Sequence, residues 1–317
     1  MRKLIMNNIC LICNSPNPDK EDYHQTCSAM FFGSPAPPVM PYALDDLDDL
    51  AAQIINTSTS VTGVQKKLSL ALHEEGQQRQ LTFVGLWGNF ILKAPVDAYP
   101  NLPENEYLTM KLANIAGIQT VPHALIRLQS GELAYLTRRI DRSQNGKVPM
   151  EDMAQLTGKM TEEKYRGSVE QIGKIILRYC SNRLFDALRL YELAIFSFIT
   201  GNGDMHLKNY SLITRTEGVT LAPAYDLLNT RLVISENEDP EDSALTINGK
   251  RRKITLEDFH HLANSLGLIR KQTENVLKRF LKTRREMENC IQNSFLPRDM
   301  NRYYLEILKT RLDRLTT

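Results

Sequence analysis

Residues Gly201–Asn209 read GNGDMHLKN and are the most informative stretch of the sequence. The apolar segment Leu184–Thr200 before them predicts a helix, and two short strands are expected after them, at Tyr210–Thr214 and Val219–Ala222. A glycine-flanked loop at the end of a helix can hold polar side chains in an accessible position without burying them unpaired. The stretch therefore predicts a functional loop.

The polar side chains of this loop have the spacing of a phosphoryl-transfer site. Asp204 and Asn209 lie five residues apart, and Asp226 follows downstream. Phosphoryl transfer needs a carboxylate that orients and deprotonates the acceptor hydroxyl, and oxygen ligands for Mg²⁺. Asp204 fits the first role, whereas Asn209 and Asp226 fit the second, and Lys208 or His206 could stabilise the charge of the transferred group. The alternative is a polar loop whose side chains only form Asx turns.

The chain on the N-terminal side of the loop is rich in short apolar stretches bounded by Gly, Pro or Asn, as strands are. One helix is expected among them, capped by Asn101 and opened by Pro103. The C-terminal side is mostly helical, so the prediction is an α+β fold with a small strand-rich lobe and a larger helical lobe. The other expected strands are Leu68–Leu72, Leu81–Leu86, Phe90–Ala94, Thr120–Leu128 and Glu132–Thr137, and the other expected helices are Leu44–Ile54, Val169–Cys180, Leu256–Leu266, Lys271–Asn289 and Asn301–Leu315.

Two features of the strand-rich lobe suit nucleotide binding. Lys93 lies in an apolar strand and Glu106 follows thirteen residues later on the expected helix, so an ion pair could direct Lys93 at phosphates. The alternative is a solvated lysine at a sheet edge.

The hydroxyl-rich turn 58–67 could cover phosphates with backbone N–H groups and with Lys66 or Lys67. Because it holds one glycine and departs from G-x-G-x-x-G, a plain β-turn is equally consistent with it.

Seven motifs follow one another between residues 58 and 230. They are SVTGVQKK (60–67), FILK (90–93), PENEY (103–107), RIDR (139–142), PMEDM (149–153), GDMHLKN (203–209) and PAYDL (223–227). In this order they resemble the successive motifs of HipA-like serine/threonine kinases. The resemblance implies a two-lobed, protein-kinase-like fold that uses ATP and Mg²⁺.

The resemblance also implies a role for each motif. Asp204 would be the catalytic base with Lys208 beside it, Asn209 and Asp226 would hold Mg²⁺, and Glu106 would support Lys93. Thr137–Ile140 would be a hinge that hydrogen-bonds adenine through its backbone. The implied ATP-binding residues are Thr62, Gly63, Val64, Gln65, Lys66, Lys67, Lys93, Arg138, Arg139, Ile140, His206, Asn209 and Asp226.

Hydroxyl side chains at the start of the hydroxyl-rich turn 58–67 are candidates for autophosphorylation. The resemblance points to Ser60 and also to Ser58. A phosphate there adds about −1.5 to −2 charges beside the expected pocket for the phosphates of ATP, and repulsion would weaken nucleotide binding. We therefore predict self-inactivation, against the alternative that Ser and Thr are simply common turn residues.

The expected domains are a Cys-rich segment 1–33, a kinase N-lobe 34–142 and a helical C-lobe 143–317. Larger HipA proteins begin with an extra small domain, whereas 57 residues precede the turn here, so the chain resembles the short HipT toxin kinases. This implies a small HipS-like antitoxin, a DNA-binding HipB-like antitoxin and a protein substrate such as an aminoacyl-tRNA synthetase. The alternatives are a small-molecule phosphotransferase, which also uses an Asp followed five residues later by an Asn, and a kinase-shaped binding protein without turnover.

Two pairs of metal-ligand residues lie near the N-terminus. Two residues separate Cys10 from Cys13, two separate His24 from Cys27, and ten residues lie between the pairs. Three thiolates and one imidazole would make a closed tetrahedral zinc site. The alternative is reduced cysteines that pack as small apolar side chains.

The composition excludes several classes of protein. The 317 residues carry 39 Lys and Arg against 37 Asp and Glu, a net charge of +2, so a globally basic nucleic-acid coat is excluded and no direct specific DNA binding is expected. Residues 250–317 nevertheless hold sixteen Lys and Arg and eight Asp and Glu, which indicates a solvated helix face or a docking surface. No apolar run nears the roughly 18 residues of a membrane helix, and we identify no signal peptide. Five cysteines, an odd number, favour a reducing compartment, so a cytoplasmic location is expected.

Two further segments carry expectations. Residues 34–41, SPAPPVMP, predict a stiff linker. The acidic segment Glu236–Asp242 predicts a mobile loop after the expected metal-binding Asp226.

Overall fold

The computed structural model describes residues 9–47, 49–50, 67–76, 78–84, 87–143 and 146–316. The chain divides into two compact units. Unit 1 comprises Met1–Tyr107, Val121–Ile140 and Asn293–Leu296, and unit 2 comprises Leu108–Thr120, Asp141–Gln292 and Pro297–Thr317.

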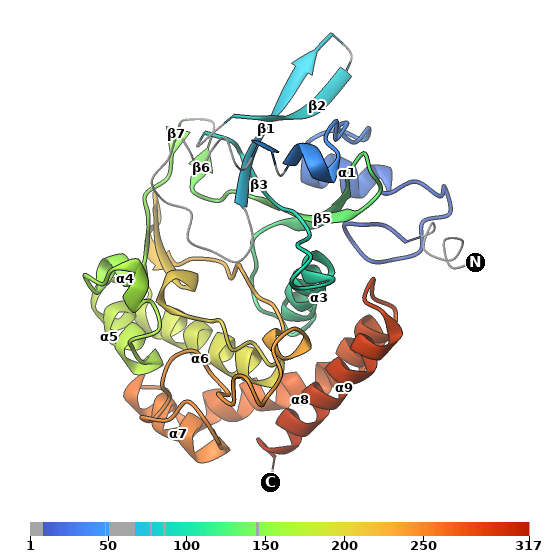
Figure 1. The fold of residues 1–317 in the computed structure, drawn as a ribbon. Helices are drawn as coiled ribbons and strands as arrows, with labels where there is room; N and C mark the ends of the chain where they lie inside the picture. The colour runs from blue at the N-terminus through green and yellow to red at the C-terminus, as the bar shows by residue number, and fades with distance from the viewer. Residues whose placement is uncertain are drawn as a thin grey trace. The chain divides into compact units, whose positions relative to one another are not determined.

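Unit 1 is built on a five-stranded antiparallel sheet with the strand order β2-β1-β3-β5-β4 (Figure 1). All five expected strands occur, and the helix predicted from Asn101 is present as α3. The strand predicted from Thr120 begins only at His123, because Pro122 has no N–H to donate to a ladder. The elements are α1 (Gln25–Phe32), β1 (Lys67–Glu75), β2 (Gln78–Phe83), β3 (Phe90–Lys93), α3 (Leu102–Ile115), β4 (His123–Arg127) and β5 (Leu133–Arg138).

The register of this sheet explains why β3 is its buried centre. Leu92 of β3 pairs with Leu68 of β1 and with Leu136 of β5, and all three side chains are at most 2% exposed. Residues paired across strands share a face, so these leucines form one apolar row. The next row holds Lys67, Lys93 and Tyr135, which therefore point to the opposite face.

The segment predicted to be a linker packs against the sheet instead. Val39 forms a parallel bridge with Gln80 of β2, its N–H donates to Arg79 O at 2.9 Å, and its carbonyl accepts from Leu81 N–H at 3.0 Å. Because β2 is an edge strand, its outer backbone groups are available to this segment. The linker prediction for residues 34–41 was wrong. Of the acidic helix expected at Leu44–Ile54, residues 44–47 and 49–50 are helical and residues 51–54 lie outside the described part.

Unit 2 is mostly helical and carries a small three-stranded sheet with the order β10-β9-β8 (Figure 1). The helices expected from the sequence all occur, with ends that differ by at most three residues. The elements are β6 (Arg142–Ser143), β7 (Gly146–Lys147), β8 (Met150–Asp152), α4 (Met153–Leu156), α5 (Val169–Tyr179), α6 (Arg183–Ile199), β9 (Ser211–Arg215), β10 (Gly218–Leu221), α7 (Leu256–Ser265), α8 (Arg270–Gln292) and α9 (Arg298–Asp313), with short 3₁₀ turns η1 (Thr161–Glu163), η2 (Leu207–Asn209) and η3 (Thr230–Leu232).

Helix α6 is the core of unit 2 and leads directly into the loop 201–209. Every residue from Leu190 to Ile199 is buried. A helix that is apolar on all sides must be surrounded by protein, so its C-terminal end is held firmly. Among the residues that the structure describes, no helix combines the length and apolar character needed to cross a lipid bilayer.

Candidate active site

The loop after α6 has its shape because of one glycine. Gly201 has φ +70°, and a Cβ there would lie 2.8 Å from Asn229 Oδ1. That backbone conformation and that close approach both require glycine. The chain therefore turns sharply at the end of α6, as expected from the sequence.

Thr230 then fixes the turned loop from the other side. Its Oγ1 donates to Gly201 O at 3.0 Å and accepts from Gly203 N–H at 2.9 Å. Within the loop, Asn202 Oδ1 accepts from Asp204 N–H at 3.1 Å, which is an Asx-type bond. The Asx turn is thus made by Asn202, and the Asp204 carboxylate is directed elsewhere.

The Asp204 carboxylate is held by an aromatic hydroxyl. Tyr165 Oη donates to Asp204 Oδ1 at 2.5 Å, and His206 Nε2 lies 3.9 Å from the same oxygen. The Asp204 side chain is 38% exposed, so it can still meet a substrate. Burial, followed by the negative charge of Asp204, raises the pKa of Tyr165, so its hydroxyl stays protonated and remains a donor.

Sequence analysis missed Tyr165, which lies 39 residues before Asp204 in the chain. One backbone contact joins the turn that carries Tyr165 to the loop, and an arginine from elsewhere in unit 2 binds the same turn. Leu207 N–H donates to Lys164 O at 3.0 Å, and the Arg251 guanidinium donates to Tyr165 O. No motif marks these contacts, because they join segments that are distant in the chain.

His206 is a buried, neutral side chain beside Asp204. Its ring packs edge-on against Tyr165 at 5.2 Å, and its Nδ1 is buried with no hydrogen-bond partner among the described residues. Burial lowers the pKa of His206; Asp204 and Asp226 oppose this and Lys164 adds to it. The charges of Asp204 and Asp226 both reach His206, so all three predicted residues lie in one neighbourhood of unit 2.

Asn209 and the segment of Asp226 are tied to the same loop. Asn209 Nδ2 donates to Asp204 O at 2.8 Å, so the amide oxygen Oδ1 is the atom left to act as a ligand. Tyr225 Oη donates to Lys208 O at 3.1 Å, which holds the residue before Asp226 against the end of the loop. Asp226 itself has φ +60°, a conformation that Asp tolerates better than most residues. An amide oxygen and a carboxylate are donors that suit Mg²⁺.

Lys208 forms an ion pair with a residue outside the loop 201–209. Its Nζ is 3.4 Å from Asp152 Oδ2, and the Asp152 carboxylate also caps α4 by accepting from Gln155 N–H at 2.9 Å. The ion pair that Lys208 forms is therefore with Asp152 and not with Asp204.

The acidic segment Glu236–Asp242 is bound by two arginines from elsewhere in unit 2. Buried Arg231 donates to the carbonyls of Asp239 and Glu241, and its Nη2 lies 3.8 Å from Asp239 Oδ2. At the end of the segment, Asp242 accepts from Arg314 at 2.8 Å. Arginines elsewhere in unit 2 thus bind the second half of the segment through its carbonyls and carboxylates. The expected mobility of the segment stays a prediction.

In unit 1, Lys93 and Glu106 form the ion pair that their sequence positions indicated. Lys93 Nζ lies 2.6 and 2.7 Å from the two carboxylate oxygens, and the residues are 4% and 2% exposed. The ammonium group also lies 5.4 Å from the centre of the Tyr135 ring. A solvated lysine at a sheet edge is thereby excluded, since β3 is the central strand.

In the expected hinge Thr137–Ile140, two backbone N–H groups already form hydrogen bonds within unit 1. Arg138 N–H donates to Pro122 O at 3.0 Å and Arg139 N–H donates to Asn89 O at 2.8 Å. The backbone N–H groups of Arg138 and Arg139 are therefore already used within unit 1. Lys67 is exposed at the start of β1. The other residues of the expected phosphate-covering turn lie outside the described residues: Ser58, Ser60, Thr62, Gly63, Val64, Gln65 and Lys66.

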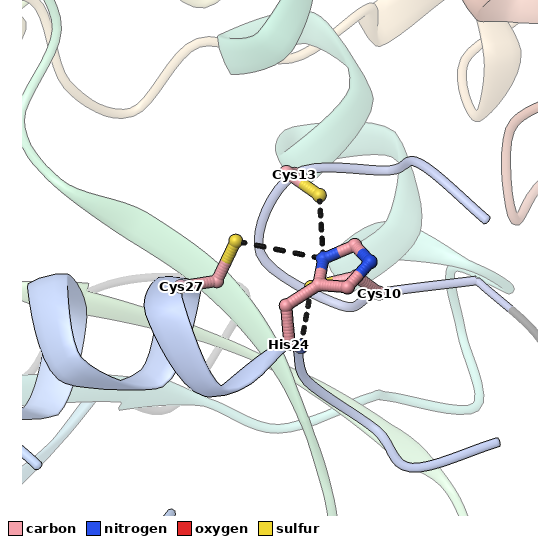
Figure 2. A group of neighbouring side chains, drawn as sticks. All are labelled: Cys10, Cys13, His24 and Cys27. Atoms are coloured by element: carbon pink, nitrogen blue, oxygen red, sulfur yellow. Dashed lines mark hydrogen bonds between the residues drawn. The ribbon is translucent and has the colours of Figure 1, made fainter. Parts of the chain in front are cut away.

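The four predicted metal ligands of unit 1 lie close together. Figure 2 shows Cys10, Cys13 and Cys27 gathered around His24, and the four candidate ligand atoms all lie within 4.8 Å of one another. Cys10 and Cys13 come from one turn, whereas His24 and Cys27 lie at the start of α1. All five cysteines of the chain lie in the described part, and all are free thiols.

A strand-rich unit with a buried Lys–Glu pair and a helical unit with an Asp-x₄-Asn loop are the parts of a protein-kinase-like fold. The chain belongs to the family of the HipA-like C-terminal domain, which matches residues 59–290. The "Putative kinase Y4dM" of Sinorhizobium fredii is 34% identical over 228 residues, 67% of this chain and 54% of that protein. A "Putative kinase" of Haemophilus influenzae is 27% identical over 282 residues, 80% of each chain.

A third relative connects sequence and structure. The serine/threonine-protein kinase toxin HipA of Shewanella oneidensis is 27% identical over 193 residues, 54% of this chain and 43% of HipA. A solved complex of HipA, HipB and operator DNA from the same organism superposes with a TM-score of 0.67 at 21% identity, over 87% of this chain and 71% of that one. This likeness confirms the predicted α+β, kinase-like fold. The chain spans about half the length of Y4dM and less than half that of HipA.

Proposed function

We propose that this chain is an ATP-dependent serine/threonine protein kinase with Asp204 as its catalytic base. The observation that carries the proposal is the accessible Asp204 carboxylate beside a buried, neutral His206 whose Nδ1 is unpartnered among the described residues. Catalytic groups are often found where burial and neighbouring charges perturb a pKa in this way. The names of the relatives support the same reaction class.

The geometry of Asp204 suggests how it would act. Tyr165 donates to Oδ1, so Oδ2 is the oxygen that would accept the proton of a substrate hydroxyl. As that hydroxyl oxygen bonds to the γ-phosphorus, the bond from the γ-phosphorus to the oxygen of the leaving ADP would break. Asn209 Oδ1 and Asp226 would hold Mg²⁺, which neutralises charge on the phosphate oxygens when bound. Lys208 could also neutralise charge on the phosphate oxygens, but its ammonium group would first have to break the ion pair with Asp152.

The roles in unit 1 follow the family resemblance. Lys93 would contact the ATP phosphates, with Glu106 fixing its ammonium group, and the turn 62–67 would cover them. A lysine that is already ion-paired and buried is pre-organised, because little side-chain entropy remains to be lost on binding.

The biological role that we infer is that of a cytoplasmic toxin kinase of the HipT type. A translation component such as an aminoacyl-tRNA synthetase would be its substrate, and small HipS-like and DNA-binding HipB-like proteins would restrain it. The solved complex of the Shewanella protein with HipB and operator DNA supports this kind of partnership. Phosphorylation of Ser58 or Ser60 would inactivate the kinase.

Labelled ATP tests the function and its alternative together. With Mg²⁺, the purified chain is expected to label candidate synthetases and itself, with its own phosphate at Ser58 or Ser60. Label found only in a cell metabolite would instead establish a small-molecule phosphotransferase. Phosphopeptides of the wild type are compared with those of Asp204→Asn; equal phosphate at Ser58 or Ser60 in both would exclude autophosphorylation.

Replacing Tyr165 by Phe is expected to lower kcat about tenfold and to leave the KM for ATP unchanged. A hydrogen bond to a charged acceptor contributes about 1.5–3 kcal/mol, and only Asp204 loses it, because the Phe ring keeps the contact with His206. Steady-state kinetics measure both constants. Tyr179→Phe, at the exposed end of α5, is the matched control. An unchanged kcat in Tyr165→Phe would remove the positioning role from Tyr165.

A further inference from the structure

The N-terminal turn and the start of α1 together contain four metal-ligating side chains whose ligand atoms all lie within 4.8 Å of one another. Cys13 Sγ lies 3.4 Å and Cys27 Sγ 3.7 Å from His24 Nδ1, and Cys10 Sγ accepts from His24 N–H at 3.5 Å (Figure 2). Zinc with bonds of about 2.3 Å to sulfur and about 2.0 Å to nitrogen separates neighbouring tetrahedral ligands by roughly 3.6 Å. The two distances from His24 Nδ1 to sulfur have the size that one zinc ion requires, and Cys10 Sγ lies within 4.8 Å of the other three ligand atoms.

The orientation of His24 favours a metal over chance packing. His24 Nε2 lies 3.0 Å from Pro16 O, and a carbonyl can only accept, so Nε2 carries the proton. The lone pair of Nδ1 then faces the sulfurs. A ring nitrogen bonded to a backbone carbonyl while the other faces the ligand cluster is the usual outer contact of a zinc-bound histidine.

Three thiols lie close together in this cluster, and a bound cation would stabilise them as thiolates. Three sulfurs this close repel one another when ionised, and a divalent cation converts that repulsion into attraction. A disulfide could join only two of them.

We infer that Cys10, Cys13, His24 and Cys27 bind one structural Zn²⁺. The four protein ligands fill a tetrahedral site and leave no position for substrate, so the role is structural. The ion links the turn 10–13 to the start of α1, two segments that are too short to bury a core of their own.

The linked segments in turn hold the edge of the sheet. Leu125 N–H of edge strand β4 donates to Leu11 O at 2.9 Å, and Tyr23 Oη donates to Leu125 O at 2.9 Å. Tyr107 Oη of α3 donates to Ile12 O at 3.0 Å, next to Glu106 in the chain. Zinc would thus stabilise the edge of unit 1 and the helix that carries Glu106.

Metal analysis of the full chain, purified without added metal or chelator, tests the inference. One zinc per chain is expected for the wild type, and none for Cys13→Ser or Cys27→Ser. Cys290→Ser in α8 of unit 2 is the matched control and is expected to keep one zinc. Wild-type protein without zinc, or Cys27→Ser with a full equivalent, would overturn the assignment.

A second measurement avoids variants that fail to fold. Titration of the folded wild type with a mercurial reagent is expected to release one zinc, seen with a chromogenic chelator, as three thiols react. Replacement by Co²⁺ is expected to produce the intense visible bands of tetrahedral thiolate coordination. Reaction of the thiols without release of zinc, or a Co²⁺ spectrum typical of octahedral coordination, would contradict the zinc site.

Discussion

Changing Asp204 to Asn is expected to lower the rate of phosphoryl transfer to protein about a thousandfold. Asn cannot accept the proton of the acceptor hydroxyl, and a positioned general base contributes roughly 10²–10⁴-fold. The change is nearly isosteric, so two hydrogen bonds remain: the N–H of residue 204 still donates to Asn202 Oδ1, and Asn209 Nδ2 still donates to the carbonyl of residue 204. Initial rates with labelled ATP measure the effect.

The control for this change is Asp313→Asn at the end of α9, whose side chain is 53% exposed. It is expected to keep the wild-type rate. Nucleotide affinity, measured by titration, is expected to be the same in wild type and Asp204→Asn, because Asp204 is not assigned a contact with ATP. A rate for Asp204→Asn within tenfold of the wild type would show that another group is the base.

Breaking the ion pair between Lys93 and Glu106 from either side is expected to destabilise unit 1 by about 3–5 kcal/mol. Lys93→Met leaves a buried carboxylate without its cation, and Glu106→Leu leaves a buried ammonium group. The double variant removes both charges and is expected to lose less than the sum of the single losses. Chemical denaturation of all four proteins measures the coupling.

Arg270 and Glu274 on α8 supply the matched pair for this cycle. Their side chains are 91% and 46% exposed and lie 2.8 Å apart. An exposed i,i+4 pair contributes about 0.3–0.5 kcal/mol, so its cycle is expected to show little coupling. All Lys93 variants, including the double, are expected to lose kinase activity. Strictly additive losses for Lys93 and Glu106 would show that the pair is not energetically coupled, and an active double variant would remove Lys93 from the reaction.

Local sequence determined the parts of this protein that depend on neighbouring residues. The apolar run before Gly201 forms a helix as its sequence predicted, and the glycine turns the chain because only glycine tolerates φ +70° beside Asn229. The spacing of Asp204 and Asn209 places both in one turn. The short spacing within each Cys and His pair likewise puts its two ligands together.

Tertiary structure alone decided what joins distant segments. Tyr165 reaches Asp204 across 39 residues, and Val39 covers the open edge of β2 where the sequence indicated a linker. Arginines hold the acidic segment that its composition marked as mobile. The physical reason is the same each time: hydroxyls, edge carbonyls and buried charges must find partners, and those partners are set by packing and not by chain distance. The sequence predicted the candidate reacting groups, and the fold supplied the contacts that orient them.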